Sequence, residues 1–155
     1  MIIKRKKPEV YVMMGPAGSG KSSWIEKNLG HNFPVVSKDQ IRKDLGIMNS
    51  EKKAIGTDEE EGFVNKIQDQ KIDEFLRKRI DFAIDNINLG KSLENLVRKL
   101  RKYNVEIIGV KLETPLNVIL RRRPEIPRGV LLRMYDDAKK VDLSVFDRII
   151  KIKGV

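Results

Sequence analysis

Residues Gly15–Ser22 carry the clearest chemical pattern in the chain, because they read G-P-A-G-S-G-K-S. This order satisfies G-x-x-x-x-G-K-[ST], a phosphate-binding loop that lies between a strand and a helix. Glycines let successive backbone N–H groups curl around phosphate oxygens, and the positive helix end favours the same anion. Lys21 would reach the β- and γ-phosphates, and the Ser22 hydroxyl would ligate magnesium. The motif predicts a nucleoside triphosphate site, the alternative being a glycine-rich turn without a ligand.

The predicted nucleotide site covers one continuous segment. Its residues are Gly15, Pro16, Ala17, Gly18, Ser19, Gly20, Lys21, Ser22 and Ser23. Such a loop does not by itself distinguish a motor, a switch GTPase, an ABC-type ATPase or a kinase. The chain is short, at 155 residues, and contains no N-K-x-D guanine-reading motif. A kinase acting on a small substrate or on a polynucleotide is therefore favoured.

A kinase also needs a residue that orients and deprotonates the attacking hydroxyl. The stretch "VVSKDQIR" offers Asp39 near the start of a helix, and Arg42 on the same helical face. Asp39 could accept the hydroxyl proton, and Arg42 could grip a phosphate of the acceptor or the one in transfer. The alternative is an acidic first-turn residue favoured by the helix dipole and paired with a surface arginine.

Two further polar residues follow the third expected strand in "DFAIDNIN". In an open α/β sheet, ligands bind at the carboxyl ends of the strands, so Asp85 and Asn88 would lie on the ligand side. Asp85 could hold the magnesium shell through water, and Asn88 could orient the catalytic loop. Either residue could instead end the strand and start a turn.

Four arginines lie within eight positions of "LRRRPEIPRG", bracketed by prolines between two expected helices. They are Arg121, Arg122, Arg123 and Arg128. An arginine on a mobile lid could supply positive charge to the departing γ-phosphoryl group. A basic helix end in solvent is the alternative, because cations near a helix C-terminus are favourable in any case.

Hydrophobic periodicity predicts strands that alternate with helices, which indicates an α/β domain with a mainly parallel sheet. The expected strands are 9–14, 33–37, 79–85, 105–112 and 147–153. Six helices are expected. Three have both limits: one runs from Lys21 to a stop at Gly30, and the others cover 63–78 and 130–140. A fourth begins at a Ser37–Gln40 capping box, a fifth extends from a Ser92 cap to Leu100, and the sixth begins at Pro115. We expect the acidic segment 56–62, "GTDEEEG", to be a solvated loop rather than a binding surface.

Composition narrows the class of protein further. The formal net charge of +10 favours polyanionic partners such as nucleic acid, although many basic proteins bind none. No apolar run approaches the ~20 residues of a membrane span, and the N-terminus lacks a secretory signal, so we expect a cytoplasmic protein with no membrane partner. The chain contains no cysteine and suits a single domain over 1–155. The sequence is compatible with a homo-oligomer and does not fix the oligomeric state.

The order of these motifs resembles that of the P-loop kinase domain of bacteriophage polynucleotide 5′-kinases. If the protein is viral, we expect it in the cytoplasm of the host cell. The matching stretches are "GPAGSGKSSW", "VVSKDQIR", "AIDNINL" and "LRRRPEIPRGVLLRMYDDAKK". The resemblance implies a three-layer P-loop kinase fold with an Arg-bearing lid, and ATP with Mg²⁺ as cofactors. It implies that Lys21 and Ser22 bind ATP and magnesium, that Asp39 is the general base, and that Arg42 contacts the acceptor phosphate. The lid segment before Pro127 is shorter than usual, so the lid arginine would be Arg122 or Arg123.

The function this implies is transfer of the ATP γ-phosphate to 5′-hydroxyl ends of DNA or RNA, which prepares them for ligation during repair. No phosphatase domain, which some members of that family carry, is expected within the chain. Two other functions stay open. One is a kinase for a sugar, nucleoside or other small molecule, and the other is a nucleotide-dependent ATPase or binding module that transfers nothing to a hydroxyl.

Overall fold

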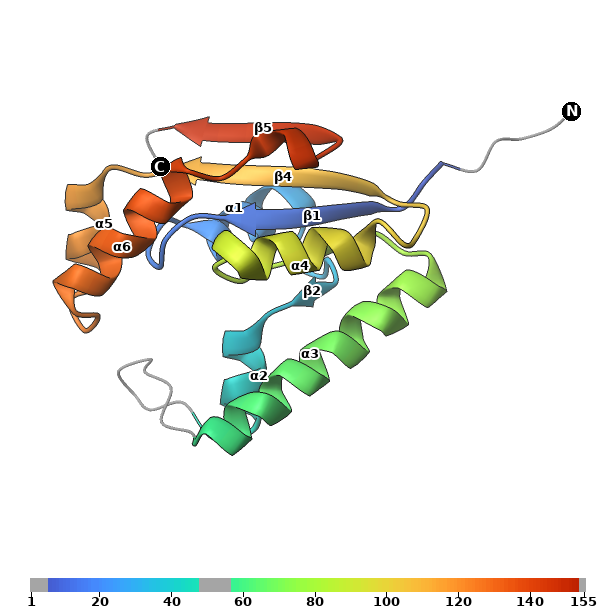
Figure 1. The fold of residues 1–155 in the computed structure, drawn as a ribbon, viewed down its shortest axis with the longest axis horizontal. Helices are drawn as coiled ribbons and strands as arrows, with labels where there is room; N and C mark the ends of the chain where they lie inside the picture. Colours follow the sequence, from blue (N-terminus) through green and yellow to red (C-terminus); the bar gives the residue numbers. More distant parts are fainter. Residues whose placement is uncertain (1–5, 48–56, 154–155) are drawn as a thin grey trace, which may run out of the picture.

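The computed structural model describes residues 6–47 and 57–153. Five strands alternate with six α-helices and one short 3-10 helix, η1, within those ranges (Figure 1). The elements are β1 (Glu9–Met14), α1 (Lys21–Leu29), β2 (Val35–Val36), α2 (Lys38–Asp44), α3 (Asp58–Lys78), β3 (Phe82–Ile84), α4 (Gly90–Leu100), β4 (Glu106–Glu113), α5 (Leu116–Arg122), α6 (Arg128–Lys139), η1 (Leu143–Val145) and β5 (Arg148–Lys153).

The strands form one sheet in the order β2-β3-β1-β4-β5, and every pairing in it is parallel. Val10 lies opposite Phe82 on β3 and opposite Ile107 on β4. From β1 the chain moves outward to β2, returns through β3, and then crosses to β4 and β5 on the other side of β1. The carboxyl ends of β1 and β3 therefore meet at a switch point, which is where open parallel sheets bind ligands. The expected α/β three-layer fold is confirmed.

Two apolar layers cover the two faces of the sheet, because side chains alternate along each strand. On one face, Val10 and Val12 of β1 belong to a buried cluster with residues of α3 and α4. On the other face, Met13 of β1 packs in a cluster with Ile25 of α1. Figure 1 shows α1 behind the sheet and α4 in front of it. Strands buried on both faces explain why the β1 and β4 sequences are almost continuously apolar.

The pair α2 and α3 extends away from the sheet and has a small core of its own (Figure 1). Ile41 of α2 and Val64 of α3 are buried there together with Ile47. The other half of α3 joins the main core through Ile72 and Leu76. A single long helix thus connects the main body of the sheet to the position of α2.

Several expected boundaries are wrong, each for a local reason. Strand β3 begins at Phe82 rather than at position 79, because Arg79 ends α3 in the left-handed conformation at φ 57°. Helix α4 begins at Gly90, so Ser92 lies inside it and does not cap it. Pro115 precedes α5 as its N-cap residue. Ser37 caps α2 by accepting from the Gln40 N–H, but the Gln40 side chain donates to Asp44, so the expected capping box is only half formed.

The acidic segment 57–62 is also not the solvated loop expected from its composition. Thr57 caps α3 in a complete capping box with Glu60, and the helix begins at Asp58. Four acidic residues in the first turn suit the positive end of the helix dipole. Gly56 lies outside the described residues. A charge run that looked like a loop is therefore a helix start, and it extends α3 by five residues before the expected position 63.

Candidate functional site

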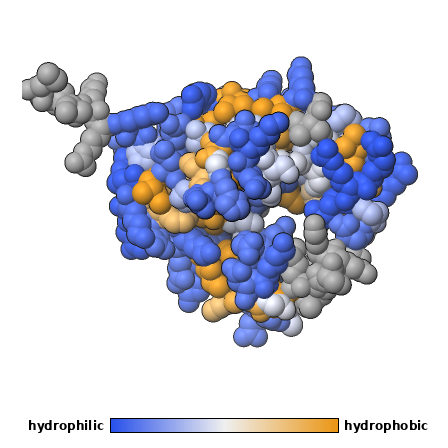
Figure 2. All heavy atoms as spheres, turned by 180° about the vertical axis from the view of Figure 1, so that it is seen from behind, coloured by the Kyte–Doolittle hydropathy of each residue, from blue (hydrophilic) through white to orange (hydrophobic). Residues whose placement is uncertain are grey.

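A cleft opens at the carboxyl edge of the sheet, between the phosphate loop, α2, the end of β3 and the arginines of α5. Its volume is about 910 Å³. Figure 2 shows a hollow near the middle of this side of the molecule, with hydrophilic side chains along its rim. The cleft walls include Lys21, Asp39, Asp85 and Arg122. Residues far apart in the sequence therefore reach one site.

The phosphate loop has the backbone geometry that its sequence predicts. Gly20 is the N-cap of α1 at φ 97°, in the left-handed region that favours glycine, and no side chain caps the helix. The first N–H groups of α1 are thus left to serve an anion. Gly18, at φ 85°, lies so close to the residue after α5 that an added Cβ would be 2.9 Å from the Cγ of Arg123. A side chain at position 18 would both strain the loop and displace Arg123.

Two buried side chains brace the loop from below. Thr114, after β4, donates its hydroxyl to the Ser19 carbonyl at 2.7 Å. Asn88 donates its side-chain amide to the Met13 carbonyl at 2.6 Å and also to carbonyls of its own turn. Since Asn88 is 4% exposed and does not line the cleft, its position supports a structural role at the base of the loop.

Lys21 folds back against the loop that it follows. Its Nζ donates to the carbonyls of Gly15 at 3.1 Å and Pro16 at 2.9 Å. Burial lowers the pKa of Lys21 to about 8, although the carboxylates of Asp85 and Asp39 act in the opposite direction. The ammonium is therefore a desolvated cation at the floor of the cleft, and a phosphate placed beside it would gain a strong interaction.

Ser22 and Asp85 bring two oxygen groups together at the mouth of the loop. The Ser22 hydroxyl donates to the Asp85 carboxylate at 2.5 Å. Hydroxyl, carboxylate and phosphate oxygens with retained waters are the ligands that Mg²⁺ prefers, so the pair fits this ion. Within the two described ranges, no group of three or more His, Cys, Asp or Glu residues is placed to hold a metal. Ser22 and Asp85 are the side chains that could hold Mg²⁺ beside the phosphates.

On the opposite wall, Asp39 and Arg42 form an ion pair on α2. Nη1 of Arg42 donates to Oδ1 of Asp39 at 2.7 Å. Glu61 of α3 holds the same arginine, because its two carboxylate oxygens accept from Nε at 3.0 and 3.1 Å and its Oε1 lies 2.9 Å from Nη2 in an ion pair. The Arg42 side chain is 19% exposed, whereas that of Asp39 is 59% exposed. Arg42 is thus fixed between two carboxylates, while Asp39 faces the open cleft.

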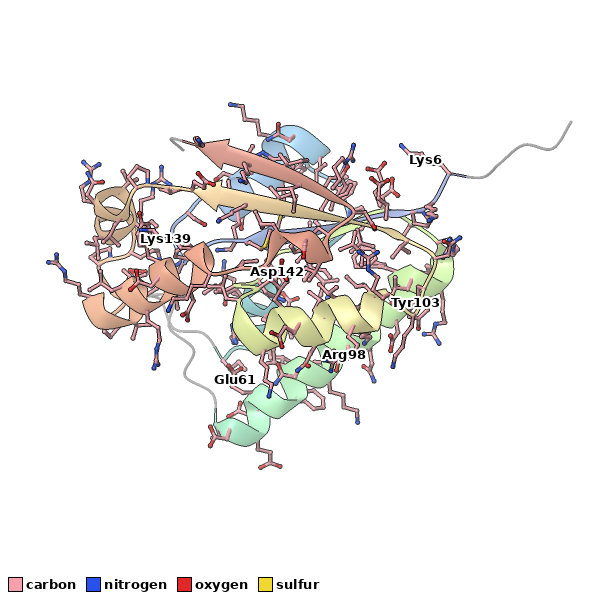
Figure 3. All side chains as sticks on the ribbon, turned by 45° about the horizontal axis from the view of Figure 1, so that its top comes forward. Lys6, Glu61, Arg98, Tyr103, Lys139 and Asp142 are labelled. Atoms are coloured by element: carbon pink, nitrogen blue, oxygen red, sulfur yellow. The ribbon has the colours of Figure 1, made fainter. Side chains whose placement is uncertain are left out.

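Glu61 and Asn86 are the site residues that the sequence did not reveal. Figure 3 labels Glu61 near the start of α3, facing the region of α2. The Asn86 side-chain oxygen accepts from the Lys38 N–H at 2.8 Å, and its amide donates to Gln68 of α3 at 2.6 Å. Asn86 therefore joins the start of α2 to β3 and α3. The sequence signal that would have placed Glu61 on a helix is the Thr57-x-x-Glu60 spacing of a capping box, which forms at the start of α3.

Two of the four arginines at the end of α5 and after it, Arg122 and Arg123, line the cleft. Arg122 donates to the Gly18 carbonyl at 3.0 Å. Arg123, which follows α5, forms an ion pair with Glu125. Arg121 and Arg128 are exposed and do not line the cleft. Arg122 and Arg123, the two candidates named from the sequence, thus both lie against the phosphate loop. Both therefore remain candidates for the arginine that would contact the phosphates.

A protein-family model described as an AAA domain matches residues 10–151. The chain belongs to the AAA domain family. No curated protein matches it by sequence. In the part of this AAA domain that the structure describes, no helix is long and apolar enough to cross a membrane.

Solved structures with the same fold as this AAA domain include kinases of different substrates. A chain of the Pnkp1/Rnl/Hen1 RNA repair complex superposes with a TM-score of 0.73 at 17% identity over 90% of this chain and 48% of that one. This chain therefore spans about half the length of that protein. A sugar kinase from Janibacter gives 0.59 at 16% identity, over 97% and 88% of the two chains. The APS kinase CysC of Mycobacterium tuberculosis, solved with AMPPNP and APS, gives 0.57 at 17% identity over 97% and 92%.

This AAA domain thus has the same α/β fold as these solved structures, with its phosphate loop between β1 and α1. The structure brings one set of expected site residues to the cleft wall: Ala17, Gly18, Gly20, Lys21, Ser22, Ser23, Asp39, Arg42, Asp85, Arg122 and Arg123. Gly15, Pro16 and Ser19 are buried beneath them.

Proposed function

We propose that the chain is an ATP-dependent kinase that transfers the γ-phosphoryl group to the 5′-hydroxyl of DNA or RNA. The observation that carries the proposal is that one cleft holds the phosphate loop on one wall and the exposed Asp39 on the other. A γ-phosphate in the loop and a hydroxyl at Asp39 would then face each other, which is the arrangement that in-line transfer needs.

On the donor side, Lys21 and the N–H groups at the start of α1 bind the β- and γ-phosphates. Ser22 and Asp85 hold Mg²⁺, which when bound neutralises charge on the phosphate oxygens. Arg122 and Arg123 supply positive charge from the lid while the γ-phosphoryl group is in transit. Burial around Lys21 makes this charge stabilisation stronger than it would be in water.

On the acceptor side, Asp39 accepts the proton of the attacking hydroxyl. The hydroxyl oxygen bonds to the γ-phosphorus as the bond from that phosphorus to the β–γ bridging oxygen breaks, and ADP leaves. Arg42 engages Oδ1 of Asp39, so the other carboxylate oxygen is oriented for the proton. Arg42 and Glu61 thereby hold the base in place, and Asp39 does the proton transfer.

Basic charge supports a polynucleotide as the acceptor. The chain carries a formal net charge of +10, and Lys38 and Lys43 stand beside Asp39 on the cleft wall. Lysines there would attract a phosphodiester backbone, and affinity would fall as salt rises. The likeness to a chain of an RNA repair complex agrees with this choice.

A small-molecule acceptor is the second candidate. It is favoured by the likeness to APS kinase and to a sugar kinase, which extends over most of both chains. A cleft of about 910 Å³ would also hold a nucleotide and a small acceptor together.

The test is transfer of labelled γ-phosphate from ATP to a panel of acceptors at several salt concentrations. The panel contains a 5′-hydroxyl oligonucleotide, the same oligonucleotide with a 5′-phosphate, a nucleoside and simple sugars. We expect label only where a free 5′-hydroxyl is present, with the oligonucleotide preferred at low salt. Label on sugars alone would select the small-molecule kinase. ATP turnover without label on any acceptor would select the ATPase.

A further inference from the structure

We propose that a groove beside the phosphate loop binds the backbone of a single-stranded polynucleotide, away from the reacting end. Lys111 and Lys139 line this groove, and Lys151 and Lys153 of β5 lie next to it, so we call it the lysine groove. Its volume is about 490 Å³, and within the described ranges it shares no lining residue with the cleft. The inference goes beyond the proposed transfer reaction, because such a contact holds the strand and takes no part in the chemistry.

Two neighbouring strands place like charges side by side at their carboxyl ends. Lys111 of β4 lies opposite Lys151 of β5 in the parallel register, so both side chains point to the same face of the sheet. Helix α6 adds Lys139, whose Nζ lies 4.3 Å from the centre of the Tyr135 ring. Figure 3 shows Lys139 between α6 and the end of the sheet. Like charges on neighbouring strands repel each other, and an anion bound between them would remove this repulsion.

At the amino ends of the same strands, basic side chains are paired with carboxylates. Arg148 of β5 forms ion pairs with Glu9 and Glu106. Arg101 forms one with Asp147, the residue before β5. The four cations of the lysine groove differ, because none of them forms an ion pair with any other residue that the structure describes. The amino ends of the strands thus neutralise their own charge, whereas the carboxyl ends leave positive charge for a ligand.

One carboxylate lies within the groove and limits its charge. Glu113 lines the groove and stands opposite Lys153 in the register of β4 and β5. Four lysines against one glutamate leave an excess of three positive charges. An excess of this sign attracts polyanions and makes their binding depend on salt.

The apolar lining of the groove decides between kinds of polyanion. Leu112, Pro115 and Ala138 line it together with Tyr135. An unpaired base of a single strand can enter an apolar slot while its phosphates stay on the lysines, whereas the bases of a duplex are stacked inside the helix. A single-stranded polynucleotide therefore matches both the charge and the apolar part of the groove. An acidic polypeptide such as polyglutamate matches the charge alone.

The experiment measures binding of a strand that cannot accept a phosphate. The probe is a labelled single strand of about twelve nucleotides with a 5′-phosphate, a length that such grooves cover, and the readout is fluorescence anisotropy. We expect Lys111→Gln/Lys151→Gln to raise the Kd at physiological salt by roughly tenfold, and to flatten the slope of log K against log salt by about 0.7 for each lysine removed. The matched control is Lys66→Gln/Lys102→Gln, which removes two exposed charges outside the groove and should have little effect.

Two further variants test the sign of the effect and its location. Glu113→Gln removes the carboxylate of the groove, so we expect it to bind the strand more tightly than wild type. Lys139→Gln changes an exposed residue of α6 and leaves the sheet untouched, so it should weaken binding without any change in β4 or β5. The inference is overturned if the two double variants lose the same affinity, if Lys139→Gln binds like wild type, or if Glu113→Gln binds no more tightly. It is also overturned if a duplex of the same sequence, or polyglutamate, displaces the labelled strand as well as the unlabelled strand does, since the groove would then suit another polyanion.

The choice of probe separates this inference from the proposed function. Transfer to a nucleoside should be unchanged in Lys111→Gln/Lys151→Gln, because the nucleoside occupies the cleft alone, whereas the KM for a long 5′-hydroxyl strand should rise with the Kd. If wild type transfers phosphate to no acceptor, the proposed function fails, and the inference still stands on the binding of the 5′-phosphate strand. If transfer to strands is normal and the double variant binds the strand like wild type, the inference alone fails.

Discussion

The two walls of the cleft are built in different ways. The donor wall is one continuous segment, Gly15–Ser23, whose backbone supplies the anion site and whose lysine is 9% exposed. The acceptor wall consists of side chains from α2 and α3, with Asp39 59% exposed. The backbone of one segment forms the anion site of the first wall, with Thr114 and Asn88 as its braces, whereas side-chain contacts between α2 and α3 assemble the second. The position of Asp39 should therefore depend on Glu61, a support that the donor wall does not share.

Asp39→Asn gives the largest effect that separates the walls. Asparagine keeps the shape of the side chain but cannot take the hydroxyl proton, so we expect transfer to fall by about 10²–10⁴-fold. Binding of an ATP analogue, measured by calorimetry, should change little, because the phosphates sit on the donor wall. Asp44→Asn on the same helix is the matched control and should keep full activity. Equal loss of nucleotide binding and transfer in Asp39→Asn would show that the walls are not separable.

Lys21→Met tests the donor wall, because it should weaken nucleotide binding and leave acceptor binding intact. Methionine fills a similar volume without the charge, so we expect transfer to fall by about 10²–10³-fold, as when one stabilising donor is lost. ATP-analogue binding should weaken with it, and binding of a 5′-hydroxyl oligonucleotide should persist. Lys27→Met, an exposed change at the end of α1, is the control. A Lys21→Met protein that binds the nucleotide normally would contradict the role of this lysine.

The contrast between the walls also explains what the sequence could predict. The phosphate loop could be predicted from the sequence because its chemistry depends on the spacing of adjacent residues, and the structure places it between a strand and a helix as expected. The parallel sheet followed from continuous apolar runs in β1 and β4. Asp39 and Arg42 share one helical turn, so their pairing was also foreseeable from the sequence.

The supports of the acceptor wall could not be predicted in the same way. Glu61 lies nineteen residues from Arg42 and contacts it only because α3 packs against α2 through Ile41 and Val64. In the sequence it stands in a run of four acidic residues, none of which is distinguished by type. The sequence predicts that Asn88 orients the catalytic loop. In the fold, its amide donates to the carbonyl of Met13 in β1, a contact that the sequence does not reveal. Partner choice across elements depends on packing, which one sequence does not specify.

Glu61→Gln tests whether the acceptor wall depends on this distant support. Glutamine keeps the shape but loses the charge that holds Arg42, so we expect kcat to fall about tenfold, in line with the loss of a charged hydrogen bond. The KM for ATP should not change. Glu59→Gln, in the same helical turn and exposed, is the control. Glu61→Gln and Arg42→Gln should also be non-additive in the double variant, because they act on Asp39 through one contact chain. Additive losses would assign Glu61 a separate role.

The smallest expected effect, measured between pH 8 and pH 9, is a pH dependence that belongs to the donor wall alone. Burial places the pKa of Lys21 at about 8 in the free protein, and a bound triphosphate should raise it because the anion favours the charged form. Well below pH 8 the lysine is charged in both states, so Lys21 adds no pH dependence to nucleotide affinity there. Above pH 8 binding must take up a proton, and affinity should fall by up to about tenfold per pH unit until the pKa of the bound state is reached.

Calorimetry with an ATP analogue in buffers of different ionisation enthalpy measures the proton uptake directly. In Lys21→Met that uptake should vanish, whereas in Asp39→Asn it should remain, since Asp39 has only an indirect electrostatic effect on Lys21. Uptake that persists without Lys21 would move the titrating group elsewhere and remove burial of this lysine as its cause.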